Sequence, residues 1–97
     1  METQVRIYRV RDGELAHFVE EWKEQIKPLR ESLGFRVLGA WASEEDSRFA
    51  WVLAYDGDDG FAAANDRYYD SPERAAFDPD PARLLDETDH FLATPLL

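Results

Sequence analysis

The chain has 97 residues, a length at which a single domain with a small core is expected. Its 21 acidic and 11 basic residues give a formal net charge of −10, which argues against nucleic-acid or anionic-membrane partners, because both need a basic surface. The absence of cysteine excludes disulfides, thiolate catalysis and cysteine metal sites, and it fits a reducing cytoplasm.

The N-terminal stretch METQVRIYRV lacks the basic-then-apolar pattern of a signal peptide, and no apolar run approaches membrane-spanning length. A cytoplasmic protein without a membrane partner is therefore expected. Gln4 to Arg11 is a predicted strand, in which Arg6 and Tyr8 share one face. Asp12-Gly13 ends this strand and opens a helix.

The clearest predicted element is an amphipathic helix from Glu14 to Leu33. Its apolar residues recur at three- and four-residue spacing, as expected for one buried stripe: Leu15, Phe18, Val19, Trp22, Ile26, Leu29 and Leu33. Pro28 should bend or interrupt the helix because it has no amide donor, and Gly34 is a suitable C-terminal cap.

The segments Phe35–Ala42 and Phe49–Tyr55 form a predicted hairpin around an acidic turn. Alternation places Phe35, Val37 and Trp41 on one face of the first arm and Phe49, Trp51, Leu53 and Tyr55 on one face of the second. Two registers remain open. If Ser43 lies opposite Arg48, odd-numbered residues of one arm face even-numbered residues of the other, whereas a one-residue slip places odd-numbered residues opposite each other. Neither face is polar enough for solvent, so we expect the hairpin to be covered on both sides.

The remainder of the chain reads as a helical region followed by one strand. Asp58 or Asp59 can cap a helix carrying Phe61, Ala64 and Tyr68. Two further helix starts are predicted where a capping residue precedes a proline, at Ser71-Pro72-Glu73 and at Asp80-Pro81. The first of them begins a short helix that runs through Phe77. The last predicted strand is Glu87 to Ala93.

This order of elements predicts an α+β, ferredoxin-like βαββαβ fold, in which a four-stranded antiparallel sheet has its helices on one face. We expect one domain over residues 1–97. The uncovered face would carry more apolar surface than a monomer usually exposes, so a homodimer through this sheet face, a dimeric α/β barrel, is predicted.

Four segments resemble the NIPSNAP family in order and spacing: Val5–Val10 with Gly13 and Leu15, Leu33–Trp41, Val52–Asp56, and Leu92–Leu96. The resemblance implies a dimeric α/β-barrel fold and little about chemistry. The sequence departs from the expected pattern at two positions. Trp51 replaces a histidine that we expect in many members, and Arg74 replaces the usual aromatic residue after Pro72-Glu73.

Arg6 and Tyr8 are the first candidate site residues: in a barrel interior they would supply a fixed cation and a hydrogen-bond donor, and otherwise Arg6 pairs with a surface carboxylate. Trp41, Trp51 and Tyr55 are candidates for a ligand-binding wall, or else belong to the core and dimer interface. His90 could act as a general base or simply be a half-exposed strand residue, whereas His17 is expected on the surface.

Two functions follow as hypotheses. The first is binding or transformation of a modest apolar or aromatic small molecule, with or without an anionic group, inside the barrel; His90, Tyr8 and Arg6 are its candidate catalytic residues. By fold analogy alone, oxidation or isomerisation is the reaction to test first. The second is a non-catalytic dimeric interaction module with a filled barrel. No metal site and no cofactor are predicted.

Overall fold

The computed structural model describes all residues from 1 to 97. Its elements follow the predicted order. The strands are β1 (Glu2–Val10), β2 (Phe35–Ser43), β3 (Arg48–Tyr55) and β4 (Leu85–Ala93). The helical segments are α1 (Leu15–Glu21), η1 (Trp22–Ile26), α2 (Lys27–Ser32), α3 (Gly60–Asp70), α4 (Pro72–Ala75) and η2 (Pro81–Leu84).

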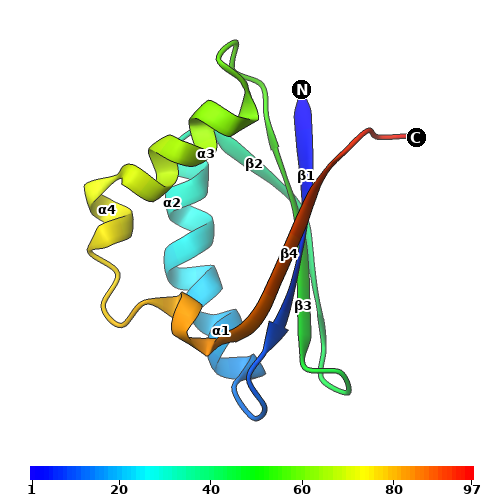
Figure 1. The fold of residues 1–97 in the computed structure, drawn as a ribbon, viewed down its shortest axis with the longest axis vertical. Coiled ribbons are helices and arrows are strands. Elements are labelled where there is room, and N and C mark those ends of the chain that lie inside the picture. Colours follow the sequence, from blue (N-terminus) through cyan, green and yellow to red (C-terminus); the bar gives the residue numbers. More distant parts are fainter.

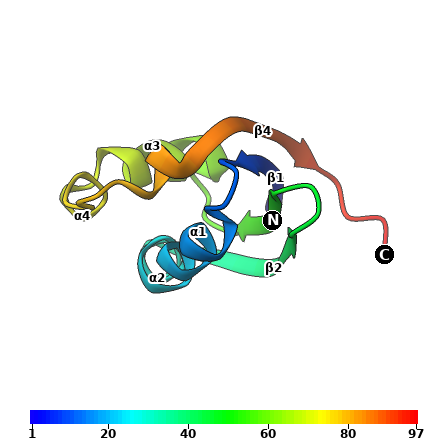
Figure 2. The ribbon, with the colours of Figure 1, turned by 90° about the horizontal axis from the view of Figure 1, so that it is seen from below.

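The four strands form one antiparallel sheet in the order β2-β3-β1-β4. All helices lie on one side of this sheet, and the other side carries only the path of the C-terminal tail (Figures 1 and 2). The predicted α+β ferredoxin-like fold is confirmed. No helix is both long and apolar enough to cross a membrane.

The core lies between the sheet and the helices and is largely aromatic. The β1–β3 register places Arg6 opposite Trp51 and Tyr8 opposite Phe49, so these four side chains share the helix-facing side. Phe18 from α1 packs edge-to-face on both Tyr8 and Phe49, and such pairs add specificity to the burial of the rings.

The hairpin uses both of the registers that the sequence left open. Near its open end Phe35 lies opposite Tyr55, and near the turn Ser43 lies opposite Arg48. The change occurs at an irregularity between Val37 and Gly39, where one extra residue enters β2. A one-residue shift reverses the face of every later side chain, so the prediction that Trp41 shares a face with Phe35 is wrong. Trp41 is on the open face of the sheet, 62% exposed.

The predicted long helix is divided into α1, η1 and α2. The five residues of η1 form a π-helical turn directly ahead of Pro28, where the Lys27 N–H donates to the Trp22 carbonyl. A π turn holds one more residue than an α turn, so side chains beyond it are rotated about the axis. As a result Arg30 occupies the fully buried position, and Leu29, predicted for the stripe, is only partly buried.

The predicted helix caps have mixed outcomes. Ser71 Oγ accepts from the Arg74 N–H at 3.1 Å, and Asp80 Oδ1 accepts from the Ala82 N–H at 2.9 Å, as predicted. The predicted Asp58 or Asp59 cap of α3 is wrong. Glu2 Oε1 instead accepts from the Phe61 N–H at 2.9 Å, while the Asp59 carboxylate binds Arg67 and the Tyr55 hydroxyl.

Candidate functional site: a cavity between sheet and helices

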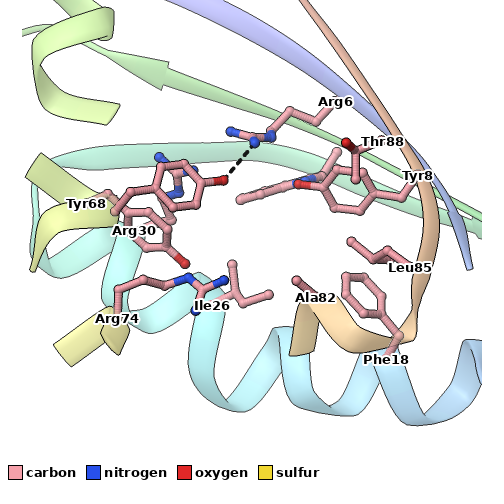
Figure 3. Close-up of a pocket in the computed structure, with 12 residues that line it drawn as sticks. Arg6, Tyr8, Phe18, Ile26, Arg30, Tyr68, Arg74, Ala82, Leu85 and Thr88 are labelled. Carbon is pink, nitrogen blue, oxygen red and sulfur yellow. Dashed lines mark hydrogen bonds between the residues drawn. The ribbon is translucent and has the colours of Figure 1, made fainter. Parts of the chain in front are cut away.

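A cavity of about 130 Å³ lies inside the single chain, between the sheet and the helices (Figure 3). Strands β1, β3 and β4 form its floor, and the helical segments contribute the rest. Its lining residues are Arg6, Tyr8, Phe18, Ile26, Arg30, Trp51, Tyr68, Tyr69, Arg74, Ala82, Leu85 and Thr88. Tyr69, Ala82 and Thr88 are exposed members of this set and mark where the cavity opens to solvent.

Arg6 reaches the cavity from the middle of β1 and is only 7% exposed. Its guanidinium donates to Gln4 Oε1 at 3.1 Å and to the Tyr69 hydroxyl at 3.0 Å, while its buried Nε has no partner. It makes no ion pair, so the alternative of a surface arginine paired with a carboxylate does not describe it.

Arg30 enters from α2 and is 1% exposed. It donates to Asn65 Oδ1 at 2.9 Å, and its Nε is also buried without a partner. Its guanidinium carbon stands 3.7 Å from the centre of the Tyr68 ring and 4.8 Å from that of Phe35. Burial, reinforced by the charge of Arg6, lowers the pKa of Arg30 from its ordinary value to about 10, so the side chain remains charged at neutral pH.

Tyr8 and Tyr68 of the lining are hydrogen-bond donors at neutral pH. Burial raises the pKa of Tyr8 and of Tyr68 above the ordinary value, against the opposing influence of the neighbouring arginines. Arg74, the third cation, donates to Asp80 Oδ1 at 3.0 Å. No aspartate, glutamate or histidine lines the cavity. The site can therefore donate hydrogen bonds and offer positive charge, but it has no ready general base.

The structure brings together three of the predicted site residues: Arg6, Tyr8 and Trp51 all line the cavity. They face the helices of their own chain, so the space that they share is not the one between two sheets that the sequence suggested. Trp51 is 1% exposed and also belongs to the hydrophobic core, so it both lines the cavity and stabilises the fold.

The other predicted site residues do not line the cavity. Trp41 is on the opposite face of the sheet. The Tyr55 ring packs on Phe35, and its hydroxyl donates to Asp59 Oδ1 at 2.8 Å, outside the cavity lining. His90 is the cross-strand partner of Arg6 on the edge strand β4, so it neighbours the cavity, but it is exposed and does not belong to the lining.

His17, expected on the surface, is half exposed, and its two ring nitrogens approach Glu14 and Glu21 at 3.1 and 2.7 Å. Side chains of histidine and the acids form no cluster of three or more able to hold a metal ion.

The family model described as NIPSNAP matches residues 2–97. The chain belongs to the NIPSNAP family. Among solved structures, an uncharacterized NIPSNAP domain protein from Burkholderia xenovorans is similar, with a TM-score of 0.84 and 22% identity over 98% of this chain and 94% of that one. A NIPSNAP family protein from Agrobacterium tumefaciens has a TM-score of 0.85 and 18% identity over 97% of this chain and 91% of that one.

The NIPSNAP fold also resembles proteins with a different name. A putative antibiotic biosynthesis monooxygenase from Nitrosomonas europaea has a TM-score of 0.72 and 14% identity over 100% of both chains. At this identity the likeness concerns the fold alone. No curated protein matches this NIPSNAP chain in sequence.

Proposed function

We propose that the chain binds, or chemically transforms, a small apolar or aromatic molecule inside the cavity between its sheet and its helices. The observation that carries this proposal is an interior space of about 130 Å³ lined by aromatic rings and buried hydrogen-bond donors. A domain without a ligand would be more stable with this space filled, because a void forfeits packing contacts. The unpartnered donors at Arg6 and Arg30 are likewise costly unless a ligand or water satisfies them.

The test is a thermal-unfolding screen against small aromatic compounds, with Ala82→Phe as the variant that blocks the cavity. Ala82 lines the cavity, its side chain is exposed, and its part in the Asp80 cap is made by its backbone N–H. We expect binders to raise the midpoint of the wild type by several degrees and to leave Ala82→Phe unchanged. Ala62→Phe, at an exposed position of α3 outside the lining, is the matched control. If no compound stabilises the wild type, small-molecule binding is wrong.

Oxidation of the bound molecule is the first reaction to test. Isomerisation by proton abstraction needs a base, and the lining holds neither a carboxylate nor an imidazole. Tyr8 and Arg6, the predicted catalytic residues that line the cavity, are suited to hold and polarise an oxygen of the ligand. The likeness to a putative monooxygenase supports this order of testing by fold analogy only. Oxygen consumption that starts when a stabilising compound is added is the measurement.

The proposed assembly is a homodimer through the open face of the sheet. Ile7, Trp41 and Phe91 lie on this face and are 36%, 62% and 50% exposed. Val5 and Val52 are cross-strand partners on the same face, so the apolar surface is continuous across the sheet. A second copy of the chain would cover it with a surface of the same kind.

The second candidate, a non-catalytic interaction module, is favoured only by the size of this open apolar face. It requires a filled interior, whereas the chain has an open cavity with charged side chains in its wall. Failure of every compound in the unfolding screen, together with a stable dimer, would support this candidate instead.

A further inference from the structure

The polar part of the cavity lining consists entirely of hydrogen-bond donors and hydroxyl groups. Three arginines line the cavity, of which Arg74 is paired with Asp80 outside the lining, and no acidic side chain enters the lining, although the chain has 21 acidic residues. Such a site suits a ligand that accepts hydrogen bonds and carries negative charge. It would repel an amine, a guanidine or a metal ion.

Arg6 and Arg30 are buried charges without a counter-charge. Neither forms an ion pair, and the carbonyl oxygens of Gln4 and Asn65 that accept from them are neutral. Both guanidinium carbons stand about equally far from the Trp51 ring, at 6.0 and 5.9 Å, so the two charges approach the same wall of the cavity. A buried charge that is not neutralised is expensive, and the cost falls mainly on Arg30, whose pKa is lowered by burial and by the charge of Arg6. Burial also acts on Arg6, but its interactions with Tyr8 and Tyr69 outweigh burial and raise the pKa of Arg6. A bound anion would remove this cost.

The lining is polarised across the cavity. Figure 3 shows Arg30 and Arg74 on one side and Phe18 and Leu85 on the other, with Arg6 between them at the sheet. Ile26 and Ala82 extend the apolar part. A ligand that satisfies both parts has a charged end and an apolar body, so inorganic phosphate or chloride would use only half of the site.

The volume limits the size of that body. About 130 Å³ is close to the roughly 150 Å³ of an engineered protein cavity known to admit benzene. One six-membered ring, or an apolar group of equal size, fills this space. The aromatic rings of Tyr8 and Trp51 in the wall suit a planar body.

We infer that the cavity selects a planar organic anion, a carboxylate or enolate on an apolar body the size of one six-membered ring, with Arg6 and Arg30 as its counter-charges. The inference rests on the proposed function, because it names the class of molecule that the same cavity takes. Guanidinium groups match carboxylate oxygens in shape as well as charge, which favours this anion over a spherical one.

The experiment measures binding of benzoate, benzamide and acetate by calorimetry at constant ionic strength. Benzamide keeps the ring of benzoate and removes the charge, whereas acetate keeps the charge and removes the ring. We expect benzoate to bind at least tenfold more tightly than either. Arg30→Gln and Arg6→Gln should abolish the preference for benzoate over benzamide. Arg67→Gln, which removes an exposed arginine paired with Asp59, should preserve it.

Each result decides between the two proposals. Equal binding of benzamide and benzoate would overturn the anion inference and leave small-molecule binding intact. Equal binding of acetate and benzoate would overturn the apolar body. Absence of binding by all three, with no stabilising compound in the unfolding screen, would overturn the proposed function as well. The comparison of the three ligands on the wild type needs no variant, so it holds even where an arginine variant fails to fold.

Discussion

The guanidinium carbon of Arg30 stands 3.7 Å from the centre of the Tyr68 ring, and no carboxylate pairs with it. An aromatic face supplies only partial compensation, of about 2 kcal/mol for a desolvated pair. The helix α2 therefore carries into the core a charge that the rest of the chain does not neutralise.

Arg30→Met should leave the ligand-free protein as stable as the wild type to within about 1 kcal/mol. The lowering of the Arg30 pKa to about 10 corresponds to a penalty of roughly 3 kcal/mol, which offsets the contacts that the side chain makes. The folded pKa is the lower one, so the penalty is complete at neutral pH and declines only as the pH rises above 10. Urea unfolding at pH 7 measures the difference.

Arg83→Met is the contrasting variant for Arg30→Met. Arg83 donates two hydrogen bonds of 2.9 Å to the carboxylate of Glu21, so its loss should lower the urea midpoint, whereas the loss of Arg30 should not. A loss above about 2 kcal/mol in Arg30→Met would show instead that this arginine is a net stabilising residue.

Glu21→Gln should destabilise the protein at neutral pH and lose its effect in acid. The hydrogen bond from Arg83, against the opposing influence of burial, lowers the pKa of Glu21 below 4.5, with His17 adding to the decrease. A carboxyl group whose pKa is lower in the folded state than in the unfolded state stabilises the fold fully at a pH above its unfolded-state pKa. This stabilisation is lost as the pH falls through its folded-state pKa. Unfolding free energies of the two proteins, about 1 kcal/mol apart at pH 7, should therefore converge below about pH 4. A constant gap down to pH 3 would contradict this account.

Ile7→Glu should convert the proposed dimer to monomers. Ile7 lies in the central strand β1 on the open face, and Asp89 lies opposite it on β4. In a dimer, each chain would bury a new carboxylate at position 7 beside Asp89 in the interface, and burying this charge beside another carboxylate is costly. Sedimentation velocity at micromolar concentration measures the mass. Ala62→Glu, at an exposed position of α3 on the opposite side of the sheet, is the control and should leave the assembly unchanged. A wild-type protein that is itself monomeric at this concentration would refute the dimer.

The same Ile7→Glu variant should still bind one ligand per chain. Every residue of the cavity lining comes from one chain, and Ile7 points to the other side of the sheet. Calorimetric titration with a compound found in the unfolding screen measures the stoichiometry. Loss of binding in a folded monomer would mean that the partner completes the site.

The sequence was sufficient for the order of the elements and for the sheet, because the hydrophobic patterns and turn residues are local signals. It was not sufficient for the position of Trp41. The glycine at position 39 inside the strand is compatible with a bulge, but the effect of the extra residue Leu38 on the later side chains appears only when β2 is paired with β3. Trp41 then covers Gly39, where an added Cβ would lie 2.5 Å from the indole ring.

Part of the cavity was predictable. Arg6, Tyr8 and Trp51 were found from their places on strands. Arg30 was missed, although it follows Ile26 by four residues at the margin of the apolar stripe. The π turn ahead of Pro28 moves it from this margin into the core, and the sequence predicted a bend there but not its geometry. Trp51 and Arg74, the two positions that depart from the expected family pattern, both line the cavity.

The net charge of −10 and the arginines of the cavity act on an anionic ligand in opposite directions. At a distance the acidic exterior repels it, and only within about one Debye length of the mouth, some 8 Å at physiological salt, does the local positive potential dominate. Added salt would therefore speed the encounter while weakening the final attraction. As the salt concentration increases, the association rate constant would rise and the dissociation rate constant would rise faster. In an electrostatically steered enzyme, by contrast, the association rate constant falls with added salt.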